Sequence, residues 1–305
     1  MKKVTKYNTD ELIQRIAEQD LSIFCDRGNV SIDESDLLDF FSQEIDPDRF
    51  EGKTILGVDI YHYSQYKPLE QTLIPILFKI IFDQVASLCV LNSSYIFQKY
   101  RDAETFEKMF ISTGDGGFIV FDTPIHAMAY AINFEMVVRY YNSSRFYPKL
   151  RKIIGPLGLR YALTTDKIYR LNDNFYGPAI INNSRILEKD SLNRFLMDKN
   201  TYNWFLQHIN GVENLQLLSI DHIRELEDFS DYNDHIEGEN EIYPEEMGFT
   251  FDRIITSDVQ KIGNITSKST SLSVYNLHLQ FQGSLSSVTQ KVIVTIGNLN
   301  TSGIQ

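Results

Sequence analysis

The sequence predicts an α/β (α+β) protein in which helices cover one face of a mixed sheet. Two observations support this prediction. Short runs of β-branched and aromatic residues alternate with longer runs of helical periodicity, and one pair of short runs is joined by a glycine-rich turn. The resulting order of strand, helix, hairpin, helix, strand and helix is typical of a palm-like (ferredoxin-like) domain.

The first elements lie in the N-terminal third of the chain. Residues 1–50 carry two short helical patterns, which predict an N-terminal helical lead-in. The run KTILGVDIYHY at 53–63 predicts a buried strand that ends in polar residues. A helix is predicted over TLIPILFKIIFDQVASL at 72–88, where Pro75 suits the first turn.

The next elements begin with a hairpin. In MFISTGDGGFIVF at 109–121, apolar flanks around Gly-Asp-Gly-Gly predict a β-hairpin with Asp115 at its tip. Thr123 and Pro124 then suit the cap and first position of a second helix. A further strand is predicted over 158–171, and the second half of FYGPAIINNSRILEKD, which ends at residue 190, predicts a third helix.

Shifts in composition divide the chain into domains. Residues 51–226 hold the strand and helix pattern that follows the lead-in. Residues 227–246 are acidic and poor in aliphatic side chains, which predicts a linker. Residues 247–305 have the alternating apolar positions of a small C-terminal β domain, which would be a sensor or an assembly surface.

Charge and composition argue against several classes of protein. A net charge of -12 and a pI near 5.0 argue against nucleic acid as a partner. No apolar run approaches the ~20 residues of a membrane span, and the N-terminus lacks the apolar stretch of a signal peptide. We therefore expect a soluble, cytoplasmic protein without membrane contact. Cys25 and Cys89 stand apart in apolar surroundings, which predicts buried free thiols and no disulfide or zinc site.

Two aspartates stand in unusual places. Asp59 interrupts an otherwise apolar strand, and Asp115 lies in a turn bracketed by glycines. A buried carboxylate is retained where it is paired or bound to a cation, and flanking glycines allow a phosphate to approach closely. If the two strands are neighbours, the carboxylates converge and suit Mg²⁺ or Mn²⁺ in two-metal phosphoryl chemistry. A plain Asp-Gly turn and a loop cap are the alternative interpretations.

Three segments carry a resemblance to a known family. GVDIYHYS, STGDGGFIVF and FYGPAIINNSRI resemble, in order and spacing, the signature blocks of the class III nucleotidyl cyclases. The resemblance implies two divalent metal ions (Mn²⁺ or Mg²⁺) per active site, held by Asp59, Asp115 and the backbone carbonyl of Ile60. It implies that Arg185 neutralises charge developing on the α-phosphate. It further implies a homodimer with composite sites, in which one protomer supplies the aspartates and the other supplies Arg185.

Some positions depart from the family pattern. The family's transition-state asparagine falls on Ile181, and Asn182 is the candidate to substitute for it. The base-reading positions hold Ile111 and Asn174, which match neither the adenine nor the guanine code. An aliphatic side chain cannot hydrogen-bond a purine edge, so we expect a base other than a conventionally read purine. Tyr63, in a tyrosine cluster after Asp59, could pack against a small base, with core packing as the alternative.

Taken together, these departures resemble the pyrimidine (uridylate/cytidylate) cyclases of bacterial anti-phage systems of the Pycsar type. This resemblance implies conversion of UTP to 3′,5′-cyclic UMP and pyrophosphate on phage infection, with a separate effector protein reading the product. Three alternatives stay open. They are a cytidylate cyclase that converts CTP to cyclic CMP, a divergent adenylate cyclase, and a catalytically degenerate domain that binds nucleotide as a sensor.

Overall fold

The computed structural model describes most of the chain from residue 51 onward. The described residues are 51–92, 95–100, 103–171, 174–217, 249–267, 270–285 and 290–304, together with Gln14 and Leu226. The lead-in predicted over 1–50, except Gln14, lies outside the described residues. Cys25 and the predicted linker at 227–246 also lie outside them.

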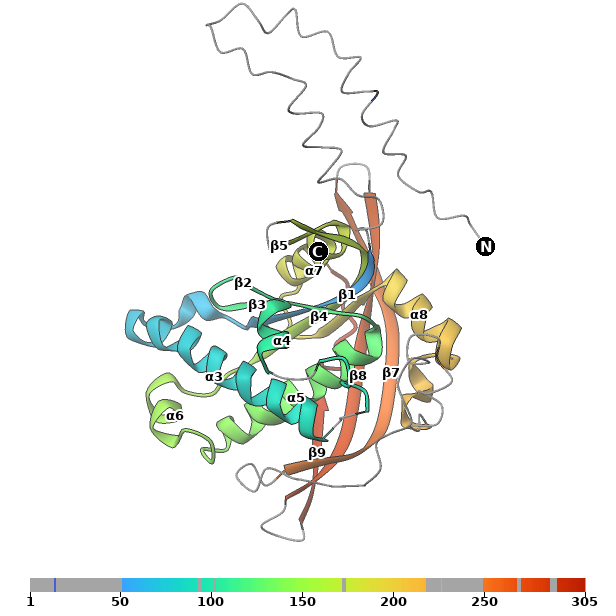
Figure 1. The fold of residues 1–305 in the computed structure, drawn as a ribbon. Coiled ribbons are helices and arrows are strands. Elements are labelled where there is room, and N and C mark those ends of the chain that lie inside the picture. Colours follow the sequence, from blue (N-terminus) through green and yellow to red (C-terminus); the bar gives the residue numbers. More distant parts are fainter. Residues whose placement is uncertain are drawn as a thin grey trace, which may run out of the picture.

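The strands that the structure describes form one nine-stranded sheet (Figure 1). Its order is β2-β3-β1-β4-β6-β8-β7, with β5 paired to β4 and β9 paired to β8. The pair β4 and β6 is parallel and the other pairs are antiparallel, so the sheet is mixed as predicted. The bounds are β1 (Glu51–Ile60), β2 (Phe110–Ser112), β3 (Gly116–Phe121), β4 (Leu159–Leu171), β5 (Asn174–Tyr176), β6 (Phe195–Asp198), β7 (Phe249–Ser267), β8 (Thr270–Leu285) and β9 (Gln290–Ile296).

Helices pack on both faces of this sheet. The described helices are α3 (Pro68–Asn92), α4 (Ala103–Lys108), α5 (Pro124–Asn142), α6 (Pro148–Ile154), α7 (Pro178–Lys189) and α8 (Lys199–Ile209). Helices α3 and α5 share a core with Leu56 and Val58 of β1. The buried stripe of α7 instead meets the opposite face, where Ile186 packs with Ala162 of β4. The α+β class is confirmed, whereas the expectation of helices on one face only is wrong, because the amphipathic α7 needs an apolar surface of its own.

Helix α3 begins earlier than its sequence pattern predicts. The helix starts at Pro68, so Pro75 lies inside it and not in its first turn. A proline has no N–H to donate to the carbonyl four residues earlier, which is that of Gln71. The hydroxyl of Tyr63, in the short 3₁₀ turn Tyr63–Gln65, donates to this carbonyl at 2.9 Å. The freed acceptor therefore keeps a partner, and the helix continues through the proline.

The length of α3 also corrects the expectation about membrane spans. By length and composition alone, Pro68–Leu91 is apolar enough to cross a membrane. Half of its most apolar window is buried inside the protein, however, and the helix packs against α5. A core helix of this kind has the same apolar character as a membrane span.

The strands after residue 248 extend the sheet that holds β1. Strand β8 pairs with β6 through Phe195 opposite Leu277, and β7 and β9 flank β8. Figure 1 shows β7 and β8 as long strands running beside the shorter ones. The division into domains stays a prediction, but β8, one of the strands expected in the C-terminal β domain, is hydrogen-bonded directly to β6.

Candidate active site

The two aspartates meet at one edge of the sheet. Asp59 is the second-last residue of β1, and Asp115 lies in the turn between β2 and β3. Strand β3 pairs with β1 so that Gly116 stands opposite Asp59. The amide of Ile60 donates to the carbonyl of Asp115 at 3.2 Å. The strands are neighbours, which was the condition for the two carboxylates to converge, and we call this region the aspartate edge.

Two glycines of the turn make this approach possible. Gly114 has a φ of 102°, in the left-handed region that favours glycine. A Cβ added at Gly116 would lie 2.2 Å from the carbonyl oxygen of Val58 and 2.9 Å from the Cα of Asp59. A side chain at residue 116 would therefore force β3 away from β1 at the rung of Asp59.

Asp59 has a cationic partner that sequence reasoning missed. Arg160 stands opposite Asp59 on β4, and its Nε donates to Oδ2 of Asp59 at 2.5 Å. Burial raises the pKa of Asp59 above its ordinary value; the Arg160 guanidinium opposes this rise and the charge of Asp115 adds to it. The sequence held one signal for this pair, a single arginine at the start of an apolar strand.

The donor set fits a divalent metal shared with a phosphate ligand. Two carboxylates at one sheet edge repel one another, and a cation between them relieves this repulsion. In the part of the chain that the structure describes, no three side chains of His, Cys, Asp or Glu gather into one metal-binding group. Mg²⁺ is commonly held by one or two carboxylates, with further ligands from water and substrate phosphates. Asp59 and Asp115, with the carbonyl of Ile60 beside them, suit this kind of site.

Two adjacent asparagines of α7, the candidate Asn182 and its neighbour Asn183, lie on different sides of the helix. Asn183 is fully buried, and its amide nitrogen donates to the carbonyls of Ile55 and Ala162 at 2.9 Å each. Asn182 lies on the other side of the helix, where its Oδ1 is 3.5 Å from the NH1 nitrogen of Arg185. Ile181 beside them is 52% exposed. We call Ile181, Asn182 and Arg185 the outer face of α7, since they point away from the sheet core.

The two base-reading positions lie on different strands. Ile111 of β2 stands opposite Phe118, which stands opposite Gly57, so Ile111 projects from the same face of the sheet as Asp59. Asn174 is exposed and pairs with Leu171 of β4. Along β4, this pairing lies ~11 residues, or about 35 Å of extended strand, from Arg160. Within one chain, Asn174 and Asp59 therefore lie toward opposite ends of β4.

The hydroxyls of the tyrosine cluster are already engaged by the backbone. Tyr63 donates to Gln71, as described above, and Tyr66 donates to the carbonyl of Pro156 at 3.1 Å. Tyr61 donates to the carbonyl of Ser191 at 2.7 Å. The phenol groups therefore hold the segment after β1 in place, which leaves only the rings to contact a base.

No protein-family model and no curated protein matches this chain. Among solved structures, the guanylyl cyclase Cya2 is 11% identical with a TM-score of 0.41, covering 75% of this chain and 92% of its own. An adenylate/guanylate cyclase/hydrolase from Silicibacter pomeroyi is 12% identical with a TM-score of 0.41 (75% and 96% covered). The adenylyl cyclase CyaB from P. aeruginosa is 12% identical with a TM-score of 0.40 (75% and 94%). Because these sequence identities and TM-scores are low, the functional proposal depends on the residues of the site.

Proposed function

We propose that this chain is a metal-dependent nucleotidyl cyclase, which closes a nucleoside triphosphate into a 3′,5′-cyclic monophosphate and releases pyrophosphate. The observation that carries the proposal is the aspartate edge. The pairing of β3 with β1 brings Asp115, in the β2–β3 turn, beside Asp59 of β1, and an added Cβ at Gly114 would meet nothing within 4 Å, so there is open space at this turn for a phosphate. A plain turn aspartate and a plain loop cap would have no reason to meet in this way.

The reaction assigns a role to each part of the site. The ribose 3′-oxygen attacks the α-phosphorus, the bond to the pyrophosphate oxygen breaks, and the hydroxyl proton leaves to water. When bound, two divalent ions (Mn²⁺ or Mg²⁺) supply acidification of the 3′-hydroxyl and neutralisation of the triphosphate charge. The chain supplies the carboxylates of Asp59 and Asp115. Arg185 supplies a guanidinium for charge that develops on the α-phosphate, with Asn182 as its neighbour.

The active enzyme in this proposal is a homodimer with two composite sites. The aspartate edge and the outer face of α7 belong to one chain, but Asn174, just before α7, lies toward the opposite end of β4 from Asp59. In a two-fold dimer, the outer face of α7 from one protomer can meet the aspartate edge of the other. The exposed Ile181 and the 3.5 Å contact of Arg185 with Asn182, its neighbour on the same helix, are consistent with a surface that a partner completes.

The proposed substrate is UTP, with cyclic UMP as a signal in anti-phage defence that a separate effector reads. The support is the apolar Ile111 and the amide of Asn174 at the base-reading positions, together with the resemblance of the three sequence blocks. Ile111 projects from the face of the sheet that bears Asp59, where it offers a base no hydrogen bond. Cytosine differs from uracil by a single exocyclic group, so CTP is the nearest alternative substrate.

The experiment is a product assay on the purified protein. The chain is incubated with ATP, GTP, CTP and UTP separately, with Mn²⁺, and the products are identified by mass spectrometry. We expect cyclic UMP as the main product, and we expect EDTA to abolish it. Asp115→Ala is expected to lower the rate at least 100-fold, because it removes one of the two carboxylates.

Each alternative reading has its own outcome in this assay. If cyclic CMP is the main product, the substrate is CTP and the proposed mechanism is retained. If cyclic AMP is the main product, the pyrimidine assignment is wrong. Undiminished product from Asp115→Ala would sink the metal mechanism itself. Tight nucleotide binding without any cyclic product would favour the degenerate sensor.

A further inference from the structure

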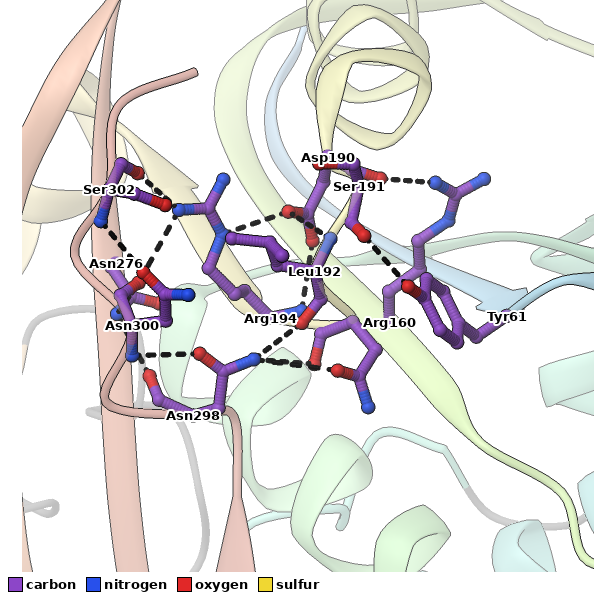
Figure 2. A network of polar contacts seen from close by, with 11 residues as sticks. Tyr61, Arg160, Asp190, Ser191, Leu192, Arg194, Asn276, Asn298, Asn300 and Ser302 are labelled. Carbon is purple, nitrogen blue, oxygen red and sulfur yellow. Dashed lines mark hydrogen bonds and ion pairs between the residues drawn. The ribbon is translucent and has the colours of Figure 1, made fainter. Parts of the chain in front are cut away.

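A chain of polar contacts connects Asp59 to the end of the described chain. Figure 2 shows the part of this chain beyond Asp59, with Arg160 and Tyr61 on one side and Asn298, Asn300 and Ser302 on the other. Between them lies the loop that follows α7, residues 190–194, which we call the junction loop. Residues 298–302, after β9, are called the C-terminal segment.

The first link joins the aspartate edge to the junction loop. The guanidinium of Arg160 uses its Nε to hold Asp59 and its NH1 to donate to the carbonyl of Asp190 at 2.5 Å. Tyr61, two residues after Asp59, adds a second tie through the carbonyl of Ser191. The guanidinium is rigid and planar, so a shift of the Asp190 carbonyl must change how Arg160 presents Asp59.

The second link is a buried ion pair inside the junction loop. Asp190 and Arg194 are each 1% exposed, and Nε of Arg194 donates to Oδ1 of Asp190 at 2.8 Å. The backbone amide of Arg194 donates to the other carboxylate oxygen at 2.9 Å. A buried pair with this many partners has one well-defined geometry, because any displacement leaves a charge unpaired.

The third link joins the junction loop to the C-terminal segment. NH1 of Arg194 donates to the carbonyl of Ser302 at 2.7 Å, and the amide of Asn298 donates to the carbonyl of Leu192. The segment is shaped by its own asparagines, since Oδ1 of Asn300 accepts from the amide of Ser302 at 3.0 Å. Arg194 thus donates to a backbone carbonyl of the C-terminal segment. The position of this segment depends on the side chains of Asn298 and Asn300.

From these links we infer that Arg160 is a positioning residue for Asp59, and that the C-terminal segment controls it through the junction loop. When residues 298–302 are docked, Arg194, Asp190 and Arg160 hold Asp59 ready for a divalent cation. When they are displaced, Asp59 loses its orientation and binds the cation more weakly. The inference rests on the proposed function in one respect, namely that Asp59 is a metal ligand.

The test measures Mn²⁺ affinity directly, from the electron paramagnetic resonance signal of free Mn²⁺ in titrations of the full-length protein. The double variant Asn298→Ala/Asn300→Ala removes the side-chain hydrogen bonds that hold the C-terminal segment. It leaves the side chains of Arg194, Asp190 and Arg160 unchanged. We expect it to bind Mn²⁺ about tenfold more weakly, as is typical when a ligand loses its outer support. Arg160→Lys keeps the charge but loses the planar fork, and we expect an effect at least as large.

A matched control separates this coupling from a general loss of stability. Arg139 also ties the main domain to a C-terminal strand, donating to the carbonyl of Thr295 at 3.3 Å and pairing with the buried Glu135. Its printed hydrogen bonds go to Glu135 and Thr295 and not to Arg160 or Asp59; it reaches β4 through Glu135, which accepts from the hydroxyl of Tyr161 at 2.8 Å. Arg139→Met should lower the melting temperature while leaving the Mn²⁺ affinity within twofold of wild type.

Combining the variants makes the inference falsifiable on its own. If the C-terminal segment acts through Arg160, adding Asn298→Ala/Asn300→Ala to Arg160→Lys should cause no further loss of Mn²⁺ affinity. Additive losses, an unchanged affinity in the asparagine variant, or tighter Mn²⁺ binding in Arg160→Lys would each overturn it. A different result would contradict the proposed function itself: Asp115→Ala would then bind Mn²⁺ with the affinity of the wild type.

Discussion

The aspartate edge and the outer face of α7 are built in opposite ways. At the aspartate edge, Asp59 is largely buried, its carboxylate is held by Arg160, and Gly116 leaves no room for a side chain. On the outer face of α7, Arg185 has the 3.5 Å contact with Asn182 and stands beside an exposed isoleucine. One half of the proposed site is therefore formed within a single chain, whereas the other half presents its functional groups outward. Under the proposed function, this difference means that a second protomer would have to complete the site.

The largest expected effect comes from inactivating the aspartate edge and the outer face of α7 separately, each by one substitution. Asp115→Ala and Arg185→Ala should each lower the cyclisation rate at least 100-fold, since each removes a group that acts on the transition state. A heterodimer of the two variants, isolated with two affinity tags, keeps one intact composite site. It should recover about half of the wild-type rate.

The control for this prediction pairs two variants of the same half. A heterodimer of Asp115→Ala with Asp59→Ala has a damaged aspartate edge in both sites and should stay inactive. Recovery in this control, or none in the Asp115→Ala/Arg185→Ala heterodimer, would mean that the two halves do not meet across a dimer.

A smaller effect is expected from filling the space at Gly116. Gly116→Ala places a methyl group against the backbone of Val58, and should lower the free energy of unfolding by about 3 kcal/mol. Mn²⁺ affinity should fall with it, because β3 carries Asp115 away from Asp59. Both quantities are measurable, by urea denaturation and by Mn²⁺ titration.

Gly52→Ala, on the neighbouring strand β1, is the matched control. An added Cβ at Gly52 meets nothing within 4 Å, so its effect on stability should stay within about 0.5 kcal/mol. Equal effects at both positions would show that the tight approach of β3 to β1 is not what holds the aspartates together.

The smallest effect tests whether Tyr63 serves the fold or the substrate. Tyr63→Phe leaves the carbonyl of Gln71 without its donor and should lower the free energy of unfolding by about 1 kcal/mol. Adding Pro75→Ala supplies a backbone N–H for that carbonyl and should restore part of the loss. The ratio of kcat/KM for UTP to that for CTP should not change. A changed ratio at unaltered stability would instead assign the hydroxyl to the base.

The parts of the site that are local in the chain were predictable. The turn Gly-Asp-Gly-Gly between apolar flanks predicted the hairpin that carries Asp115, and the apolar run before Asp59 predicted β1. Glycine and side-chain alternation act over a few residues, so their consequences can be read without the fold. The same holds for α7, which begins at a proline after a glycine with a φ of 139°.

The parts that depend on packing were not predictable. The sequence offered Asn182 as the substitute asparagine but did not show which side of α7 it occupies, whereas the structure buries its neighbour Asn183 beneath α7 and turns Asn182 toward Arg185. Pro75 suited the start of a helix, whereas Tyr63 allows the helix to pass through it. In each case a partner from another element decided the outcome.

By itself, the sequence determined the order of the elements, the turn at Asp115 and the two aspartates of the proposed chemistry, because short-range backbone preferences specify them. Only the tertiary structure decided that Arg160 holds Asp59 and that Arg194 reaches the C-terminal segment. These contacts join residues 101 and 108 positions apart in the chain. No local preference encodes such a pairing; it exists only once the sheet has brought β1, β4 and the end of the chain together.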